Sequence, residues 1–292
     1  MTIITLNDKI PEKTAVALGL FDGIHCGHGI IIENACNKGL IPSVFTFRTE
    51  SVKFKHGKPF EYIYTNSQKL HFLDKSGINY VLSPDFDDIK DMTGEEFAEK
   101  ILSGTMNAGS VICGDNFRFG KDASCGTDEL KVFGEKYDFS VEVIKLKEND
   151  FSSEKFRAML RNGELSRENP YILYGEVVHG KQIGRTIDFA TINQNYAEGQ
   201  LVLKYGVYFT LTKIDGIYYP SITNVGVKPT IEGQRLPLAE THILDFNGDL
   251  YGREIEVVFR EFIRPEMKFS SVDELKTQIS RDISEVRLLL KD

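Results

Sequence analysis

The stretch "ALGLFDGIHCGHGII", residues 17–31, decides the fold class of the first half of the chain. It begins as an apolar run typical of a buried strand and then places His25 and His28 on glycine-rich backbone before a helix-like run. Gly19 and Gly23 allow the backbone to approach a ligand closely. Because ligands bind beyond the carboxyl ends of strands in a parallel sheet, the loop is predicted to be a binding site.

Strand-like and helix-like segments alternate around this loop from residue 14 to about residue 163. Thr93 and Glu96 have the spacing of a capping box at the start of one helix. The alternation predicts an α/β domain of Rossmann type, a mostly parallel sheet with helices on both faces. The predicted strands are 14–21, 42–47, 79–84, 110–116 and 139–146, and the predicted helices are 28–39, 66–77, 93–102, 127–137 and 152–163.

From about residue 171 the hydrophobic period becomes two, which is typical of antiparallel strands. Asp215-Gly216 predicts a hairpin turn within "VYFTLTKIDGIYYPSITNV", and Asn247-Gly248 predicts a second one within "THILDFNGDLYGREIEVVFREF". A last amphipathic run, capped by Ser271, predicts a C-terminal helix. We therefore expect a first domain at 1–165 and an antiparallel β-barrel domain with a closing helix at 171–292.

Composition excludes several classes of protein. The chain has 292 residues and is 41% hydrophobic and 27% charged, which is ordinary for a two-domain globular protein. A net charge of −8 argues against a nucleic-acid-coating role. The first residues do not resemble a signal peptide, and the apolar runs are too short for a membrane span. The four cysteines show neither zinc spacing nor a CxxC pair, so we expect reduced thiols and a cytoplasmic location.

The two histidines of the opening loop have a chemical interpretation. The helix that follows the loop points free N–H groups at it, which is a natural phosphate site. His25 and His28 can bind one oxyanion from two sides, an arrangement that suits a reaction in which charge grows at phosphorus. The alternative is two ordinary loop histidines. The other histidines are interpreted as structural or surface residues: His56, His71, His179 and His242.

The HxGH pattern resembles the nucleotidyltransferases that attack the α-phosphate of ATP and expel pyrophosphate. "VICGDNFRFGKDASCG" is similar to the G-x-[DN]-F-x-F-G segment of bacterial FMN adenylyltransferases, and "FSSEKFRAML" is similar to their SST-x-x-R helix start. The resemblance implies catalysis by His25 and His28 and flavin binding by Phe117 and Phe119. It also implies ATP or phosphate binding by Gly19, Phe21, Gly23, Asn116, Ser152, Ser153 and Arg157.

The second half resembles a riboflavin kinase throughout, in "GEVVHGKQIGR", "NVGVKPT", "ETHILDFNGDLYG" and "IRPEMKFSSVDELKTQISRD". The resemblance implies that Glu240 accepts the proton of the riboflavin 5′-hydroxyl and that Thr191 and Asn193 hold Mg²⁺ and ATP. It also implies a phosphate loop with Gly180, Lys181 and Gly184. The motif order is that of the bacterial bifunctional riboflavin kinase/FAD synthetase family, whose small-molecule substrates would be riboflavin, FMN and ATP. No nucleic acid, membrane or obligate protein partner is implied.

Several signature residues of that family differ here. The family's GFPTAN reads "DFATIN", so Ala190 replaces a proline and Ile192 replaces a small residue. Glu154 replaces a threonine, which places a carboxylate near the predicted triphosphate site. The family's F-x-P-H-P reads "FTFRTE", and the usual LLGRPY stretch of the linker is missing. Three hypotheses therefore stand: a bifunctional enzyme, an enzyme with one working half, or a flavin- or nucleotide-binding paralogue without activity.

Overall fold

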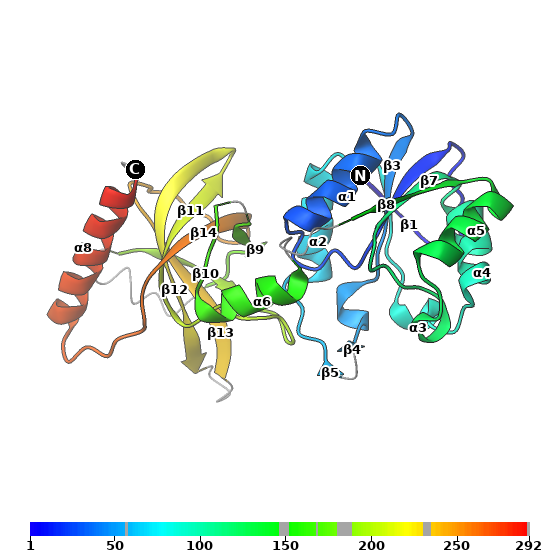
Figure 1. Ribbon diagram of the computed structural model, residues 1–292. Helices are drawn as coiled ribbons and strands as arrows, with labels where there is room; N and C mark the ends of the chain where they lie inside the picture. The colour runs from blue at the N-terminus through cyan, green and yellow to red at the C-terminus, as the bar shows by residue number, and fades with distance from the viewer. Residues whose placement is uncertain (56–57, 146–151, 168, 180–188, 230–234, 291–292) are drawn as a thin grey trace. The chain divides into compact units, whose positions relative to one another are not determined.

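The computed structural model describes residues 1–55, 58–145, 152–167, 169–179, 189–229 and 235–290 (Figure 1). The chain divides into two compact units, Met1–Ser153 and Glu154–Asp292. Each unit has its own sheet, and each is described here in its own frame.

The first unit is built on a six-stranded sheet with the order β1-β6-β3-β2-β7-β8. Every neighbouring pair is parallel, so the predicted Rossmann-type fold class is confirmed. The edge strand β1 is a three-residue strand that the sequence pattern did not predict. The strands are β1 (Thr2–Ile4), β2 (Thr14–Leu18), β3 (Ile41–Phe45), β6 (Tyr80–Leu82), β7 (Ala108–Gly114) and β8 (Ser140–Ile144).

Helices connect these strands, as the alternating pattern predicted. The predicted capping box is present, because the Thr93 hydroxyl accepts from the Glu96 N–H and the Glu96 carboxylate accepts from the Thr93 N–H. The helices are α1 (Cys26–Cys36), α2 (Asn66–Lys75), α3 (Phe86–Ile89), α4 (Gly94–Glu96), the π-helical η2 (Phe97–Thr105) and α5 (Thr127–Tyr137). Shorter elements are η1 (Thr49–Ser51), β4 (Phe54–Lys55), β5 (Lys58–Pro59) and η3 (Lys121–Ala123).

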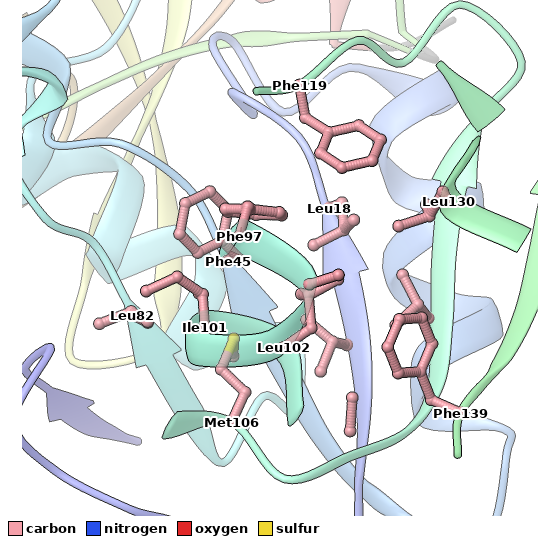
Figure 2. Packing of buried hydrophobic residues seen from close by; sticks show 14 of the residues in the cluster. Leu18, Phe45, Leu82, Phe97, Ile101, Leu102, Met106, Phe119, Leu130 and Phe139 are labelled. Carbon is pink, nitrogen blue, oxygen red and sulfur yellow. The ribbon is translucent and has the colours of Figure 1, made fainter. Parts of the chain in front are cut away.

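Strand β2 separates two hydrophobic cores because successive side chains point to opposite faces of the sheet. Ala15 and Ala17 belong to the core that includes residues of α1 and α2. Val16 and Leu18 belong to the opposite core, which Figure 2 shows with Leu18 among side chains of η2, α5 and the neighbouring strands. This burial on both faces fixes the end of β2, where the loop of residues 19–25, called here the histidine loop, begins.

The second unit is an antiparallel sheet with the order β10-β13-β12-β11-β14-β9. It curls until its edge strands meet, because the Val178 N–H donates to the Asn193 carbonyl (2.9 Å) and the Gln194 amide donates to Gly175 and Ile255. This partly closed barrel confirms the predicted fold class. The strands are β9 (Tyr171–Glu176), β10 (Thr191–Asn195), β11 (Gly206–Ile214), β12 (Ile217–Pro229), β13 (Arg235–Ile243) and β14 (Glu254–Arg264).

One predicted hairpin is confirmed and the other is wrong. Asp215 and Gly216 both have positive φ and join β11 to β12, with Ile214 opposite Ile217. Asn247-Gly248 does not join paired strands, because β13 pairs with β10 and β12, whereas β14 pairs with β11 and β9. The connection from β13 to β14 instead joins strands that are not neighbours in the sheet, and the N–H groups of Leu244 and Gly252 donate to Pro220 and Val177. The strand pairing of the whole sheet overrides the local turn signal.

Two helices complete the second unit. α6 (Ser153–Asn162) begins at the last residue of the first unit and continues in the second, where the Lys204 N–H donates to the Leu160 carbonyl. The predicted C-terminal helix is α8 (Val272–Leu289), whose Val286 is buried against the sheet. Figure 1 shows α8 in red beside the sheet. Arg264 of β14 fixes this helix through a bidentate ion pair with Asp282.

Two candidate active sites

The loop after β2 has an unusual backbone. Phe21, Gly23 and Ile24 all have positive φ, at 50°, 87° and 37°. Left-handed backbone is costly for residues with a Cβ and persists only where the surroundings impose it. The loop ends at His25, which is the N-cap of α1. This turn places both predicted histidines at the N-terminus of a helix, where free N–H groups favour an anion.

The two histidine rings lie face to face. The ring centroids of His25 and His28 are 3.8 Å apart with an interplanar angle of 23°. The Nε2 atom of His25 lies 3.3 Å from the hydroxyl oxygen of Ser153, and that hydroxyl lies 3.1 Å from the Asp22 carbonyl, to which it donates. Since the hydroxyl proton goes to Asp22, Nε2 of His25 is the donor to Ser153. The predicted residues His25, His28 and Ser153 therefore form one cluster.

Two buried side chains of the same loop, Phe21 and Asp22, support this cluster. Phe21 is fully buried and contacts His28 edge-on, with ring centroids 5.3 Å apart. The Asp22 carboxylate is buried and accepts the backbone N–H groups of Ile63 (2.8 Å) and Tyr64 (3.2 Å). These contacts fix the loop at Phe21 and at Asp22. The side chain of Phe21 thus belongs to the core, and only its backbone is left for the predicted phosphate contact.

The two phenylalanines predicted to bind flavin differ in their burial. Phe119 is 7% exposed and lies in the core shown in Figure 2, near Phe97. Its position therefore gives no support to the predicted flavin contact. Phe117 is half-buried and stacks on Phe119 at 5.7 Å, so one ring supports the other. Asn116 is exposed beside them.

The predicted triphosphate residues on α6 include an ion pair. The Arg157 side chain is only 4% exposed, and one of its guanidinium nitrogens lies 3.3 Å from the Glu154 carboxylate. The Glu154 side chain is 81% exposed. The carboxylate that departs from the family pattern is therefore partly neutralised by the arginine one helical turn away. Ser152 is exposed just before the helix.

In the second unit, the predicted residues meet across three strands. Asn193 of β10 lies directly opposite Glu240 of β13, and Glu240 lies opposite Asn224 of β12. Directly paired residues share one face of a sheet, so an amide flanks the glutamate on each side. Asn193 is 3% exposed, and its Oδ1 atom has no hydrogen-bond partner among the described residues. A buried carbonyl oxygen in this state is suited to a cation or a ligand donor.

A cavity of about 310 Å³ opens beside this row. Its wall includes Thr191, Glu240 and Asn224 from the sheet, and Leu275 and Ile279 from α8. A concave, mostly apolar pocket with a few polar groups is typical of a small-molecule site. The predicted residues Thr191 and Glu240 are thus brought to one cavity. The predicted phosphate-loop residues Gly180, Lys181 and Gly184 lie outside the described residues.

His242 also lines the cavity, although its sequence context did not single it out. Its Nδ1 donates to the carbonyl oxygen of Ala190 (2.8 Å), and its ring meets Phe189 edge-on. Ala190 is the residue that replaces the family's proline, so a hydrogen bond from β13 holds the segment there. The signal that could have found His242 is its place two residues after Glu240, on the same face of one strand.

Comparison with known proteins finds a family model for each half of the chain. A family model described as FAD synthetase matches residues 7–155, and one described as riboflavin kinase matches residues 167–290. The bifunctional riboflavin kinase/FMN adenylyltransferase of Escherichia coli K12 is 32% identical over 297 residues, which cover 96% of this chain and 94% of that protein. The chain belongs to this bifunctional family. It is accordingly a transferase of FMN and FAD biosynthesis.

Two further similarities extend over nearly the whole chain. The Bacillus subtilis bifunctional riboflavin kinase/FMN adenylyltransferase is 31% identical over 292 residues, covering 94% of this chain and 91% of that one. A crystal structure described as a macrolide-efflux protein from Streptococcus pneumoniae has a TM-score of 0.81 at 27% identity, covering 98% of this chain and 99% of that one. Within the described residues, no helix of this family member is long and apolar enough to cross a membrane.

Proposed function

We propose that this chain catalyses both reactions of its family, the phosphorylation of riboflavin to FMN and the adenylylation of FMN to FAD. The observation that carries the proposal is that each unit gathers its own set of motif residues at one place. His25, His28 and Ser153 meet at the N-terminus of α1, and Glu240 meets Thr191 at the cavity of the barrel. ATP, riboflavin and FMN are the small-molecule substrates that follow.

In the adenylyl-transfer half, His25 and His28 act on the phosphate oxygens of ATP. An FMN phosphate oxygen attacks the α-phosphorus, and the bond to the pyrophosphate leaving group breaks. Negative charge grows on the oxygens during this step, and donors placed in advance stabilise it. The Nε2 proton that His25 gives to Ser153 is the one available to a phosphate oxygen.

In the kinase half, Glu240 accepts the proton of the riboflavin 5′-hydroxyl, the hydroxyl oxygen attacks the γ-phosphorus of ATP, and the bond from that phosphorus to the ADP leaving group breaks. Phosphoryl transfer depends mainly on positioning and on charge stabilisation. Asn193 and Asn224 flank the glutamate and limit its orientation. The apolar residues of α8 that line the cavity suit the flavin ring.

The residues present fit Mg²⁺ as the metal of the kinase half. The buried Oδ1 of Asn193 and the hydroxyl of Thr191 are oxygen ligands of the kind that Mg²⁺ prefers. Among the described residues, no cluster of three or more His, Cys, Asp or Glu side chains could hold a metal ion. Mg²⁺ commonly takes the rest of its coordination from substrate phosphates and water. When bound, Mg²⁺ neutralises the phosphate charge.

One incubation tests the proposal. Purified protein is mixed with riboflavin, ATP and Mg²⁺, the flavins are separated by chromatography, and a parallel sample receives FMN in place of riboflavin. We expect FMN and then FAD from riboflavin, and FAD from FMN. If FMN is the final product in the first sample and no FAD forms from FMN, the protein has only the kinase activity. If FAD forms in the sample with FMN but nothing forms from riboflavin, the protein has only the adenylyltransferase activity. No product in either sample would refute the proposal.

A further inference from the structure

Lys69 is a buried lysine that neither proposed reaction uses directly. It lies on α2 with 1% of its surface exposed. Its ammonium donates to the hydroxyl of Thr46 (3.2 Å) and to the carbonyl oxygen of Phe47. Burying an ammonium group is unfavourable unless other groups compensate for its lost hydration. Of these two hydrogen-bond partners of Lys69, Thr46 is itself bonded to the start of the histidine loop at Leu20.

The first connection runs through Thr46. Its hydroxyl donates to the carbonyl oxygen of Leu20 (2.9 Å), so it accepts the proton from Lys69. Lys69 is thereby linked to the residue directly before Phe21. The hydroxyl is fully buried, so the surrounding protein offers no water to replace either bond.

The second connection is electrostatic and reaches the other side of Phe21. The ammonium of Lys69 attracts the buried Asp22 carboxylate, which accepts two backbone N–H groups. The Asp22 carbonyl in turn accepts the hydroxyl of Ser153, which is bonded to His25. An electrostatic attraction to Asp22, followed by two hydrogen bonds through Ser153, therefore connects Lys69 to the predicted catalytic histidine.

The loop between these two anchors contains the left-handed residues Phe21, Gly23 and Ile24. Such backbone relaxes to a commoner conformation unless its neighbours hold it. We propose that Lys69 is a positioning residue for adenylyl transfer, whose charged ammonium holds the loop 20–24 in the conformation that presents His25 and His28 to the phosphate. This inference rests on the role proposed above for the two histidines.

The protonation of Lys69 gives the inference a pH signature. Burial lowers the pKa of Lys69 to about 8, although the charged groups that face it, Asp22 of the loop and Glu50 of η1, oppose the shift. The ammonium therefore loses its charge at mildly alkaline pH. Adenylyl transfer should then decline on the alkaline side, whereas the kinase reaction in the other unit should show no decline from this cause.

The test compares Lys69→Met with Lys75→Met, which removes an exposed lysine from the same helix. Conversion of FMN to FAD and of riboflavin to FMN is measured with saturating Mg²⁺. Lys69→Met should lower kcat of the first reaction by ~10- to 100-fold, the scale of a misplaced catalytic group, and leave KM for ATP within about twofold. Its kinase kcat and both reactions of Lys75→Met should match the wild type. Unchanged FMN-to-FAD turnover in Lys69→Met would overturn the inference.

Two further measurements keep the test decisive if Lys69→Met does not fold. Thr46→Val removes the bridging hydroxyl while keeping the shape, and Thr46→Ser retains it, so only the first should lose turnover. Lys69→Arg keeps the charge at all working pH values, so its kcat should lack the wild-type decline near pH 8. Equal turnover of both Thr46 variants, or a wild-type profile that is flat to about pH 9.5, would contradict the inference. No FAD from FMN with the wild type would instead refute the proposed function of this unit, and the inference with it.

Discussion

Asn193 of β10 and Glu240 of β13 are directly paired across the antiparallel sheet of the second unit. They lie 47 positions apart in the sequence, and only the strand register places the amide beside the carboxylate. A slip of one residue would turn one of the two side chains to the opposite face. The register is thus part of the proposed kinase site.

Glu240→Gln keeps the shape of this residue and removes the ionised acceptor. We expect the phosphorylation of riboflavin to fall by ~10²–10⁴-fold, the range for a lost general base. FMN supplied directly should be converted to FAD at the wild-type rate, because that reaction takes place in the other unit. Both substrates are assayed side by side with ATP and Mg²⁺. Glu261→Gln, an exposed glutamate on β14, is the control. Retained kinase activity would show that Glu240 is not the base.

His28→Ala should act on the transition state of adenylyl transfer more than on ATP binding. Turnover of FMN to FAD should fall by ~10²-fold or more, the scale for one lost oxyanion donor, with little change in KM for ATP. His71→Ala changes a histidine of α2 outside the loop and should leave turnover intact. A raised KM with normal kcat in His28→Ala would mean that the histidine binds ground-state phosphate only.

Glu154→Thr tests whether the exposed carboxylate competes with ATP for Arg157. Removing it frees the guanidinium of Arg157, to which the motif resemblance assigns ATP binding. We expect KM for ATP in the FMN-to-FAD reaction to fall by roughly two- to fivefold, the scale of an exposed ion pair. Glu99→Thr alters an exposed glutamate on η2 and controls for net charge. An unchanged KM would show that the ion pair does not restrain Arg157.

A fragment that begins at residue 154 should fold with a higher Tm than one that begins at residue 171. The sequence alone placed the second domain at 171–292, but Leu160 of α6 is buried and its carbonyl accepts the Lys204 N–H. Gly163 also lies close to Phe262 of β14. Removing α6 therefore exposes apolar surface on the barrel. Thermal unfolding of both fragments by circular dichroism gives the comparison, and equal Tm values would contradict it.

The stability of the first unit should depend on pH through Lys69. Its pKa is about 8 in the folded chain against an ordinary lysine value of 10.5, so between these values the unfolded state binds more protons. Stability from this group therefore rises as pH increases from 8 to 10.5. The Tm of the wild type relative to Lys69→Met should increase over that interval. A difference that stays constant would show that burial does not lower the pKa of Lys69.

Local signals in the sequence were sufficient for most elements of the first unit. The apolar run before Gly19 predicted a buried strand, and the capping box at Thr93 predicted a helix start. The breakers around His25 predicted a loop at the carboxyl end of a strand. These features depend on neighbours within a few residues, so their spacing along the chain carries the information. The resemblance of the motifs to a known family added the residue roles, which stay proposals.

Tertiary structure decided what depends on distant partners. Asn247-Gly248 has the composition of a hairpin turn, yet β13 and β14 each pair with other strands, because pairing across the sheet satisfies more backbone groups than one local turn. Phe119 stands in a motif suited to a ligand but is buried in the core.

Lys69 shows most clearly that local sequence does not reveal contacts between distant residues. Its position on α2 predicts an ordinary helical lysine, and nothing in the local spacing indicates a buried charge. Only the tertiary fold brings Thr46 within hydrogen-bond distance of its ammonium and places Asp22 where the two charges interact. The sequence by itself determined which segments become strands, helices and loops. The tertiary structure decided which side chains meet, because the contacts that bury a charge or oppose an amide to a carboxylate join residues far apart in the chain.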